Sequence, residues 1–234
     1  MSLFNTPFSA LIIGSNGGIG SAITKQVKAM DHCMQVEEVN RIIFPKFDIT
    51  QEVSIASIAQ SFESRNQKFD LIFDATGGLE INGAKPEKGF KMLNQQAMED
   101  QYALNALGPA LLMKYFLPLL ERKKSTCFAT LSARVGSISD NQLGGWMSYR
   151  AAKAALNQFV KCASIEEKRK NSESCVIALH PGTVATRLSE TYGINAPKIF
   201  TPIEAADKLL NVIKHIKPIQ SGGFFAYDGS IIEY

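Results

Sequence analysis

The chain has 234 residues, of which 45% are hydrophobic and 20% are charged, so it is long enough to bury a sizeable core. Its net charge of +3 is small and its basic residues are scattered, which argues against a nucleic-acid or anionic-membrane partner. The four cysteines lack metal or redox spacing, and every apolar run is shorter than the ~18 residues of a membrane span. These features predict one cytoplasmic domain over residues 1–234, with reduced thiols and no metal.

The first predicted elements flank a glycine-rich turn. Residues 9–13 are a short apolar run typical of a buried parallel strand, and residues 19–30 follow a helical pattern. Between them stands GSNGGIG, whose glycines allow a tight turn and a close approach of the backbone to a ligand. The N–H groups and positive dipole end of the following helix favour a pyrophosphate. The turn therefore predicts a phosphate site at Gly14, Ser15, Asn16, Gly18, Ile19 and Gly20.

Strands and helices alternate along the rest of the chain. Further strands are predicted at residues 36–39, 69–77, 126–131 and 175–179, and helices at 52–65, 95–123, 149–169 and 202–216. Pro109 is expected to bend the helix that contains it. This alternation predicts an α/β fold, a Rossmann-like doubly wound, mostly parallel sheet flanked by helices on both faces. Ligands bind such sheets at the carboxyl ends of the strands.

Six short motifs stand at these strand ends and on the helices that follow. They are the Gly-x-x-x-Gly-x-Gly turn, Asp74-Ala75-Thr76-Gly77, Asn105, Ser132, the pair Tyr149 and Lys153, and Pro181-Gly182. In this order they resemble the short-chain dehydrogenase/reductase family, classical type, over essentially the whole chain. Residues 131–157 and 228–234 also resemble its carbonyl reductase and C-factor-like branch. The resemblance implies a nicotinamide-dependent oxidoreductase for a small carbonyl or alcohol substrate, assembled as a homodimer or homotetramer.

Tyr149 and Lys153 are the predicted catalytic pair. Positions i and i+4 share one face of a helix, so the lysine lies beside the tyrosine. A free phenol, with a pKa of about 10, is a poor acid–base group at neutral pH, and a nearby cation lowers that pKa. By resemblance, Tyr149 is the acid in reduction and the base in oxidation, and Lys153 also binds the nicotinamide ribose. Asn105 is then expected to hold a water that links Lys153 to solvent.

The position of the catalytic serine is ambiguous. In the family this serine stands three residues before a glycine, and counting back from Gly136 gives Ala133, with Ser132 one residue earlier. One step along a strand turns a side chain to the other face. Either the chain bulges so that Ser132 points into the site, or Ser137 takes its place, or Tyr149 polarises the substrate alone. We favour Ser132.

The resemblance also assigns residues to the nicotinamide side of the cofactor. These are Ala75, Thr76 and Gly77 after one strand, and Pro181, Gly182, Val184 and Thr186 after another. Residues 187–200 then correspond to a substrate loop.

Cofactor selectivity depends on the end of the second strand. A carboxylate there binds the ribose 2′-OH of NAD, whereas a basic residue suits the 2′-phosphate of NADP. If the strand ends at Val39, Arg41 lies just past it and favours NADP(H); another register places Glu38 at the tip and favours NAD(H). We favour NADP(H). Asp48 and Ile49 resemble the family's adenine-side motif, yet so few residues separate them from Arg41 that a strand must be abbreviated or its link irregular.

The irregular serine position and the short adenosine region leave a second hypothesis open. In it the chain binds the cofactor but acts as a signalling or interaction protein with little turnover.

Overall fold

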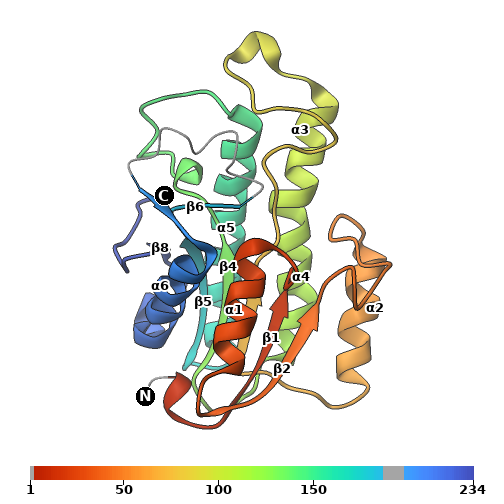
Figure 1. The fold of residues 1–234 in the computed structure, drawn as a ribbon, viewed down its shortest axis with the longest axis vertical. Coiled ribbons are helices and arrows are strands. Elements are labelled where there is room, and N and C mark those ends of the chain that lie inside the picture. Colours follow the sequence, from red (N-terminus) through yellow and green to blue (C-terminus); the bar gives the residue numbers. More distant parts are fainter. Residues whose placement is uncertain (1–2, 187–197) are drawn as a thin grey trace.

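The computed structural model describes residues 3–186 and 198–234 (Figure 1). Its centre is a six-stranded parallel sheet with the order β2-β1-β3-β4-β5-β8. The strands are β1 (Phe8–Ile13), β2 (Cys33–Val39), β3 (Leu71–Asp74), β4 (Thr126–Leu131), β5 (Ser174–His180) and β8 (Phe224–Ala226). A separate parallel pair, β6 (Thr183–Val184) and β7 (Ile199–Phe200), flanks residues 187–197. Those residues, most of the expected substrate loop, lie outside the described part of the chain.

Helices cover both faces of the sheet, as the alternating pattern predicts. The helices are α1 (Gly18–Lys28), α2 (Glu52–Glu63), α3 (Gln95–Tyr102), α4 (Gly108–Phe116), α5 (Met147–Lys170) and α6 (Pro202–His215). Short 3-10 helices occupy Leu3–Asn5, Phe90–Met92, Leu117–Leu119, Arg134–Gly136 and Pro218–Gln220, and a π-helix occupies Ala103–Leu107. The Rossmann-like prediction is confirmed. No helix in the described ranges is long and apolar enough to cross a membrane.

Side-chain alternation along the strands builds two cores, one on each face. Leu11, Ile72 and Phe128 pack toward α2, α4 and α5. Ile12, Phe73 and Leu131 pack toward α1 and α6. Strands that are buried on both faces read as continuous apolar runs, which is why β1, β3, β4 and β5 could be located from sequence.

The sheet ends at β2, and the chain then enters α2 without another strand. Residues 40–51, all described, form turns that pack Phe47 and Ile49 into the core at 7% exposure each. Of the two expected outcomes, an abbreviated strand or an irregular link, the structure shows a full β2 and no strand in the irregular link that follows it. This stretch is too short for the helical crossover that a further parallel strand needs.

The long helix expected at 95–123 is divided into three parts. α3 ends at Tyr102, the π-helix follows, and Pro109 stands in the first turn of α4. Proline has no N–H to donate to the carbonyl four residues earlier, which belongs to Asn105, so the regular ladder cannot continue there. The interruption of the regular α-helix thus falls at a candidate site residue, Asn105.

Candidate functional site

Glycines allow the tight turn that joins β1 to α1. Gly14 has φ +79°, and its N–H donates to the Val39 carbonyl at 2.7 Å. A Cβ on Gly20 would overlap the Gly14 carbonyl. Both glycines are needed for conformation and close approach. Because Gly17 is the N-cap of α1, the first N–H groups of the helix, from Gly18 onward, are placed to bind an anion.

The segment after β5 lies against this turn. A Cβ on Gly18 would lie 2.6 Å from the Thr186 methyl carbon, so the two segments share one surface. Gly182, with φ +76°, makes the reversal into β6, where a side chain would meet Phe200 and Tyr227. The structure therefore brings the predicted residues Val184 and Thr186 beside the glycine turn, whereas Gly182 packs against Phe200 and Tyr227.

Tyr149 and Lys153 lie together on the buried side of α5. Tyr149 is 8% exposed and Lys153 is 3% exposed. Lys153 Nζ lies 5.8 Å from the centroid of the Tyr149 ring. Lys153 Nζ also donates to the Leu131 carbonyl at 2.9 Å, which fixes it at the carboxyl end of β4. Burial raises the pKa of Tyr149, the opposite of the lowering expected from a nearby cation, and lowers the pKa of Lys153 to about 8. The helix therefore presents a phenol and an ammonium group as a unit.

Asn105 and Lys153 both lie against the turn at Gly77. Its amide Nδ2 donates to the Gly78 carbonyl at 2.8 Å and to Gln101 Oε1 at 2.8 Å, while its Oδ1 accepts the Gly78 N–H at 3.1 Å. A Cβ on Gly77 would lie 3.0 Å from Asn105 Oδ1 and 3.4 Å from Lys153 Nζ. The turn after β3, the π-helix and α5 thus meet around the lysine ammonium, and only a glycine fits between them.

Asp74 is a site residue to which the sequence analysis assigned no role. It is fully buried at the end of β3, and its carboxylate accepts hydrogen bonds from the Thr76 N–H at 2.9 Å and hydroxyl at 2.5 Å, and from the Thr130 hydroxyl at 2.7 Å. Burial raises the pKa of Asp74, whereas the charge of Asp74 opposes the lowering of the Lys153 pKa. The signal in the sequence that could have identified Asp74 is an acidic residue at the end of an otherwise apolar strand.

The hydroxyls of both candidate serines are bonded to groups other than Tyr149. β4 pairs with β5 residue for residue from Thr126 to Leu131, without the bulge expected before Ser132. Ser132, 4% exposed, therefore stays on the α5 face and donates to Asn157 Oδ1 at 2.7 Å. The Ser137 hydroxyl donates to the Glu233 carbonyl near the C-terminus. Ala133, half-buried, occupies the next extended position, which faces the α1 side of the sheet.

The adenosine side is built differently. β2 ends at Val39, as the register that favours Arg41 requires, and Glu38 lies within the strand opposite Ile12, paired with Lys28 at 2.6 Å. Asn40 is buried and donates to Ser15 Oγ at 2.7 Å, so it joins the strand end to the glycine turn. Arg41 follows it on the surface.

The expected adenine-side pair is divided between surface and core. Asp48 is exposed and accepts hydrogen bonds from the Thr50 N–H and hydroxyl at 2.9 and 2.8 Å. Ile49 is buried and packs directly against Gly108 at the start of α4. Through Ile49, the segment of residues 40–51, which contains no strand, therefore packs against the helix layer.

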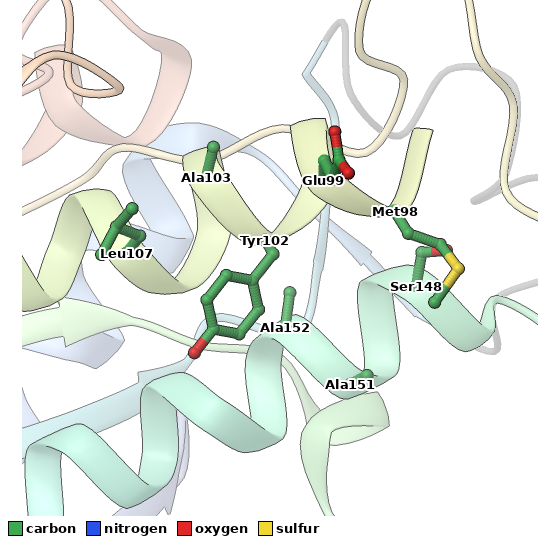
Figure 2. A pocket seen from close by; sticks show the side chains of 8 residues that line it. All are labelled: Met98, Glu99, Tyr102, Ala103, Leu107, Ser148, Ala151 and Ala152. Atoms are coloured by element: carbon green, nitrogen blue, oxygen red, sulfur yellow. The ribbon is translucent and has the colours of Figure 1, made fainter. Parts of the chain in front are cut away.

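An apolar groove of about 380 Å³ lies between α3, the π-helix and α5 (Figure 2). Figure 2 shows its lining from α3, the π-helix and α5: Met98, Glu99, Tyr102, Ala103, Leu107, Ser148, Ala151 and Ala152. Met98, Tyr102 and Leu107 are each 41–42% exposed. Large apolar side chains grouped in this way are typical of an interaction surface rather than of a polar reaction centre.

The chain is similar to known proteins over most of its length. The family model for short chain dehydrogenase matches residues 9–196, more than half of the chain. The 1-hydroxy-2-glutathionyl-2-methyl-3-butene dehydrogenase of Rhodococcus sp. (strain AD45) is 28% identical over 235 residues, covering 97% of this chain and 99% of that protein. C-signal of Myxococcus xanthus is 31% identical over 138 residues, covering 58% of this chain and 78% of that protein.

Among solved structures, NADPH-bound carbonyl reductase from chicken fatty liver has a TM-score of 0.84 at 24% identity, covering 98% of this chain and all of that one. This likeness is one of fold.

Proposed function

Because the chain belongs to the short chain dehydrogenase family, we propose that it is an NADP(H)-dependent oxidoreductase that interconverts a carbonyl and an alcohol. The observation that carries the proposal is the buried pair of Tyr149 and Lys153 at the carboxyl ends of the strands, beside a glycine turn shaped for a pyrophosphate. A dinucleotide that binds the turn would extend along the surface that Thr186 shares with Gly18.

The residues expected to hold the cofactor form three groups along that path. The pyrophosphate is assigned to the turn at Gly14–Gly20, the adenosine to Arg41, Asp48 and Ile49, and the nicotinamide side to the segments at 75–77 and 181–186. When bound, the nicotinamide supplies or accepts the hydride, and the protein supplies position and electrostatics. The fit rests on Gly14 and Gly20, because side chains there would collide with neighbouring groups and prevent the tight turn: a Cβ on Gly20 would overlap the Gly14 carbonyl, and one on Gly14 would lie 3.1 Å from the Ala75 carbonyl carbon.

Tyr149 is proposed to move the proton. In reduction its hydroxyl donates to the substrate oxygen as that oxygen gains negative charge, and in oxidation the phenolate takes the proton back. Lys153, with a pKa of about 8, is mostly protonated at neutral pH and stabilises the phenolate. Asn105 holds the turn at Gly78 beside the lysine and is proposed to keep a water path to it.

Of the three alternatives for polarising the substrate, we now favour Tyr149 acting alone. The Ser132 hydroxyl is engaged with Asn157 beneath α5, and Ala133 offers no hydrogen-bond donor from its side chain. A catalytic role for Ser132 would require its side chain to turn to the opposite face of the strand.

NADP(H) is favoured over NAD(H) by the end of β2. Glu38 is paired with Lys28 inside the strand, whereas Arg41 is exposed past the strand end, where a 2′-phosphate would approach Ser15 and Asn40. An arginine can bind a phosphate through two parallel N–H donors, which a ribose hydroxyl cannot match.

We also propose a homodimer or homotetramer in which a second copy covers the groove between α3 and α5. The apolar lining of that groove, with Met98, Tyr102 and Leu107 exposed, supports this assembly. The expected substrate is a small carbonyl or alcohol compound.

A cofactor-binding signalling protein with little turnover is the alternative. It is supported by the absence of a serine at position 133 and by the partial similarity to C-signal. The two hypotheses differ in whether Tyr149 is needed for an observable reaction.

The test is the substitution Tyr149→Phe, with Tyr115→Phe as the matched control. Tyr115 is a tyrosine on α4 that bonds Glu52, far along the chain from α5. Turnover on a carbonyl panel should fall ~10²–10⁴-fold in Tyr149→Phe and stay unchanged in the control. NADPH binding by calorimetry should be retained in both. Equal turnover in Tyr149→Phe and wild type would refute the mechanism, and tight NADPH binding without turnover in wild type would favour the signalling alternative.

A further inference from the structure

Helix α5 starts directly after a strained turn. Gly144, Gly145 and Trp146 are all left-handed, with φ of +62°, +65° and +53°. Trp146 is the N-cap residue, and the described first turn of α5 contains neither a side-chain cap nor an acidic residue. A tryptophan in this conformation is strained, so other contacts must hold the turn in place.

Glu87 makes those contacts from a distant part of the chain. The residue is 5% exposed, and one carboxylate oxygen accepts the Ser148 hydroxyl while the other accepts the Ser148 N–H at 3.3 Å. Its backbone carbonyl accepts the Trp146 N–H at 2.6 Å. A carboxylate at a helix N-terminus satisfies a backbone donor and interacts favourably with the helix dipole. Glu87 therefore caps α5 although 61 residues separate it from Ser148.

Arg150 secures the same turn from within the helix. Its guanidinium donates to the carbonyls of Gly145 at 2.9 Å, Gly144 at 3.1 Å and Val135 at 3.2 Å. In the turn that Glu87 and Arg150 hold, the indole of Trp146 lies edge-on to the ring of Tyr149, with centroids 6.4 Å apart.

We propose that Glu87 is a positioning residue for Tyr149. Ser148 directly precedes Tyr149, so the carboxylate that fixes Ser148 also fixes the phenol at the start of α5. A misplacement of about 1 Å can reduce a rate by two orders of magnitude even when its cause lies outside the reacting atoms. This inference rests on the proposed function, because it takes Tyr149 as the proton donor.

The experiment compares three substitutions at position 87 with the neighbouring exposed residue as control. Glu87→Ala removes the cap, Glu87→Asp keeps the charge but shortens the reach to Ser148, and Glu87→Gln keeps the reach without the charge. Lys88→Ala is the control, since Lys88 is exposed on the same segment. All are assayed at a temperature well below each variant's Tm, so that loss of folded protein does not enter the rate.

A positioning role predicts a separation of kcat from cofactor binding. In Glu87→Ala and Glu87→Asp kcat should fall ~10–100-fold. The Kd of NADPH should change by no more than about two-fold, because the glycine turn is not touched. Glu87→Gln should recover most of the loss, and Lys88→Ala should match wild type.

The single tryptophan of the chain gives a readout that needs no turnover. Trp146 emission should shift to longer wavelength and become more accessible to acrylamide in Glu87→Ala and Glu87→Asp, but not in Glu87→Gln. If wild type shows no turnover, the proposed function fails, and the emission alone then decides whether Glu87 holds the turn.

Two outcomes overturn the inference. One is a kcat in both Glu87→Ala and Glu87→Asp that equals wild type while wild type depends on Tyr149. The other is Trp146 emission that is identical in all variants. If Glu87→Ala does not fold, comparing kcat of Glu87→Asp with kcat of Glu87→Gln still shows whether the length of the side chain or its charge positions Tyr149.

Discussion

The two ends of the proposed cofactor path are built in opposite ways. At the nicotinamide end, Tyr149, Lys153, Asn105 and Asp74 are all buried, and each of the last three makes hydrogen bonds to other elements. At the adenosine end, Arg41 and Asp48 are exposed on a link that has no strand of its own. Buried polar groups that are fully bonded fix a geometry, whereas exposed charges add affinity without fixing one.

This difference teaches where substitutions should affect rate and where they should affect only binding. Changes at the buried end should alter turnover and stability together. Changes at the exposed end should alter cofactor affinity and leave the fold intact.

The largest effect is expected from Lys153→Met. Turnover should fall by ~10² or more, because the phenolate loses its cation. Stability should rise, with Tm higher by about 2–8 °C at pH 7, because the buried ammonium is replaced by an apolar chain of similar length. Lys168→Met, at the exposed end of α5, is the control and should change neither quantity.

The stability gain in Lys153→Met should depend on pH. The pKa of Lys153 is about 8 in the folded chain against an ordinary value of 10.5, so between these values the unfolded chain binds more protons. The free energy of unfolding of wild type therefore rises with pH across that window, and the advantage of the variant shrinks. Thermal unfolding from pH 7 to 10 measures this; a constant difference would mean that folding does not lower the pKa of Lys153.

An intermediate effect is expected from Arg41→Ala at the adenosine end. The Kd of NADPH should rise ~10–100-fold, as for the loss of charge-assisted hydrogen bonds to a phosphate. The Kd of NADH and the Tm should stay unchanged. Lys46→Ala, another exposed cation of the same link, is the matched control in calorimetric titrations. If NADH binds more tightly than NADPH and Arg41 is indifferent, the 2′-phosphate assignment is wrong.

The smallest effect is expected from Ala133→Ser, which adds a hydroxyl on the side of the strand that faces the α1 layer. One new hydrogen bond to the substrate oxygen should raise kcat ~3–10-fold. Ser132→Ala should leave kcat unchanged and lower only the Tm, since it removes the bond to Asn157. A large loss of kcat in Ser132→Ala would instead restore Ser132 as the catalytic serine.

The candidate site could be predicted from sequence wherever one local rule was sufficient. The i, i+4 spacing placed Lys153 beside Tyr149, and the glycine-rich sequence placed the tight turn between a strand and a helix that is proposed to bind the phosphates. The serine could not be placed in this way, because its face depends on whether β4 bulges, and the structure shows regular pairing with β5.

The residues that sequence analysis missed act across long separations. Glu87 reaches Ser148 over 61 residues, and Asp74 reaches Thr130 over 56. Neither belongs to a periodic pattern, and a single acidic residue in a loop or at a strand end has no local signal for its partner.

The sequence by itself determined the alternating strands and helices, the glycine turn and the helix that carries Tyr149 and Lys153, because these follow from short-range periodicity and from backbone sterics. Only the tertiary structure decided the edge of the sheet at β2, the face to which Ser132 turns, and the capping of α5 by Glu87. Those features depend on which distant segments become neighbours, and burial then requires each polar group to find its partner among them.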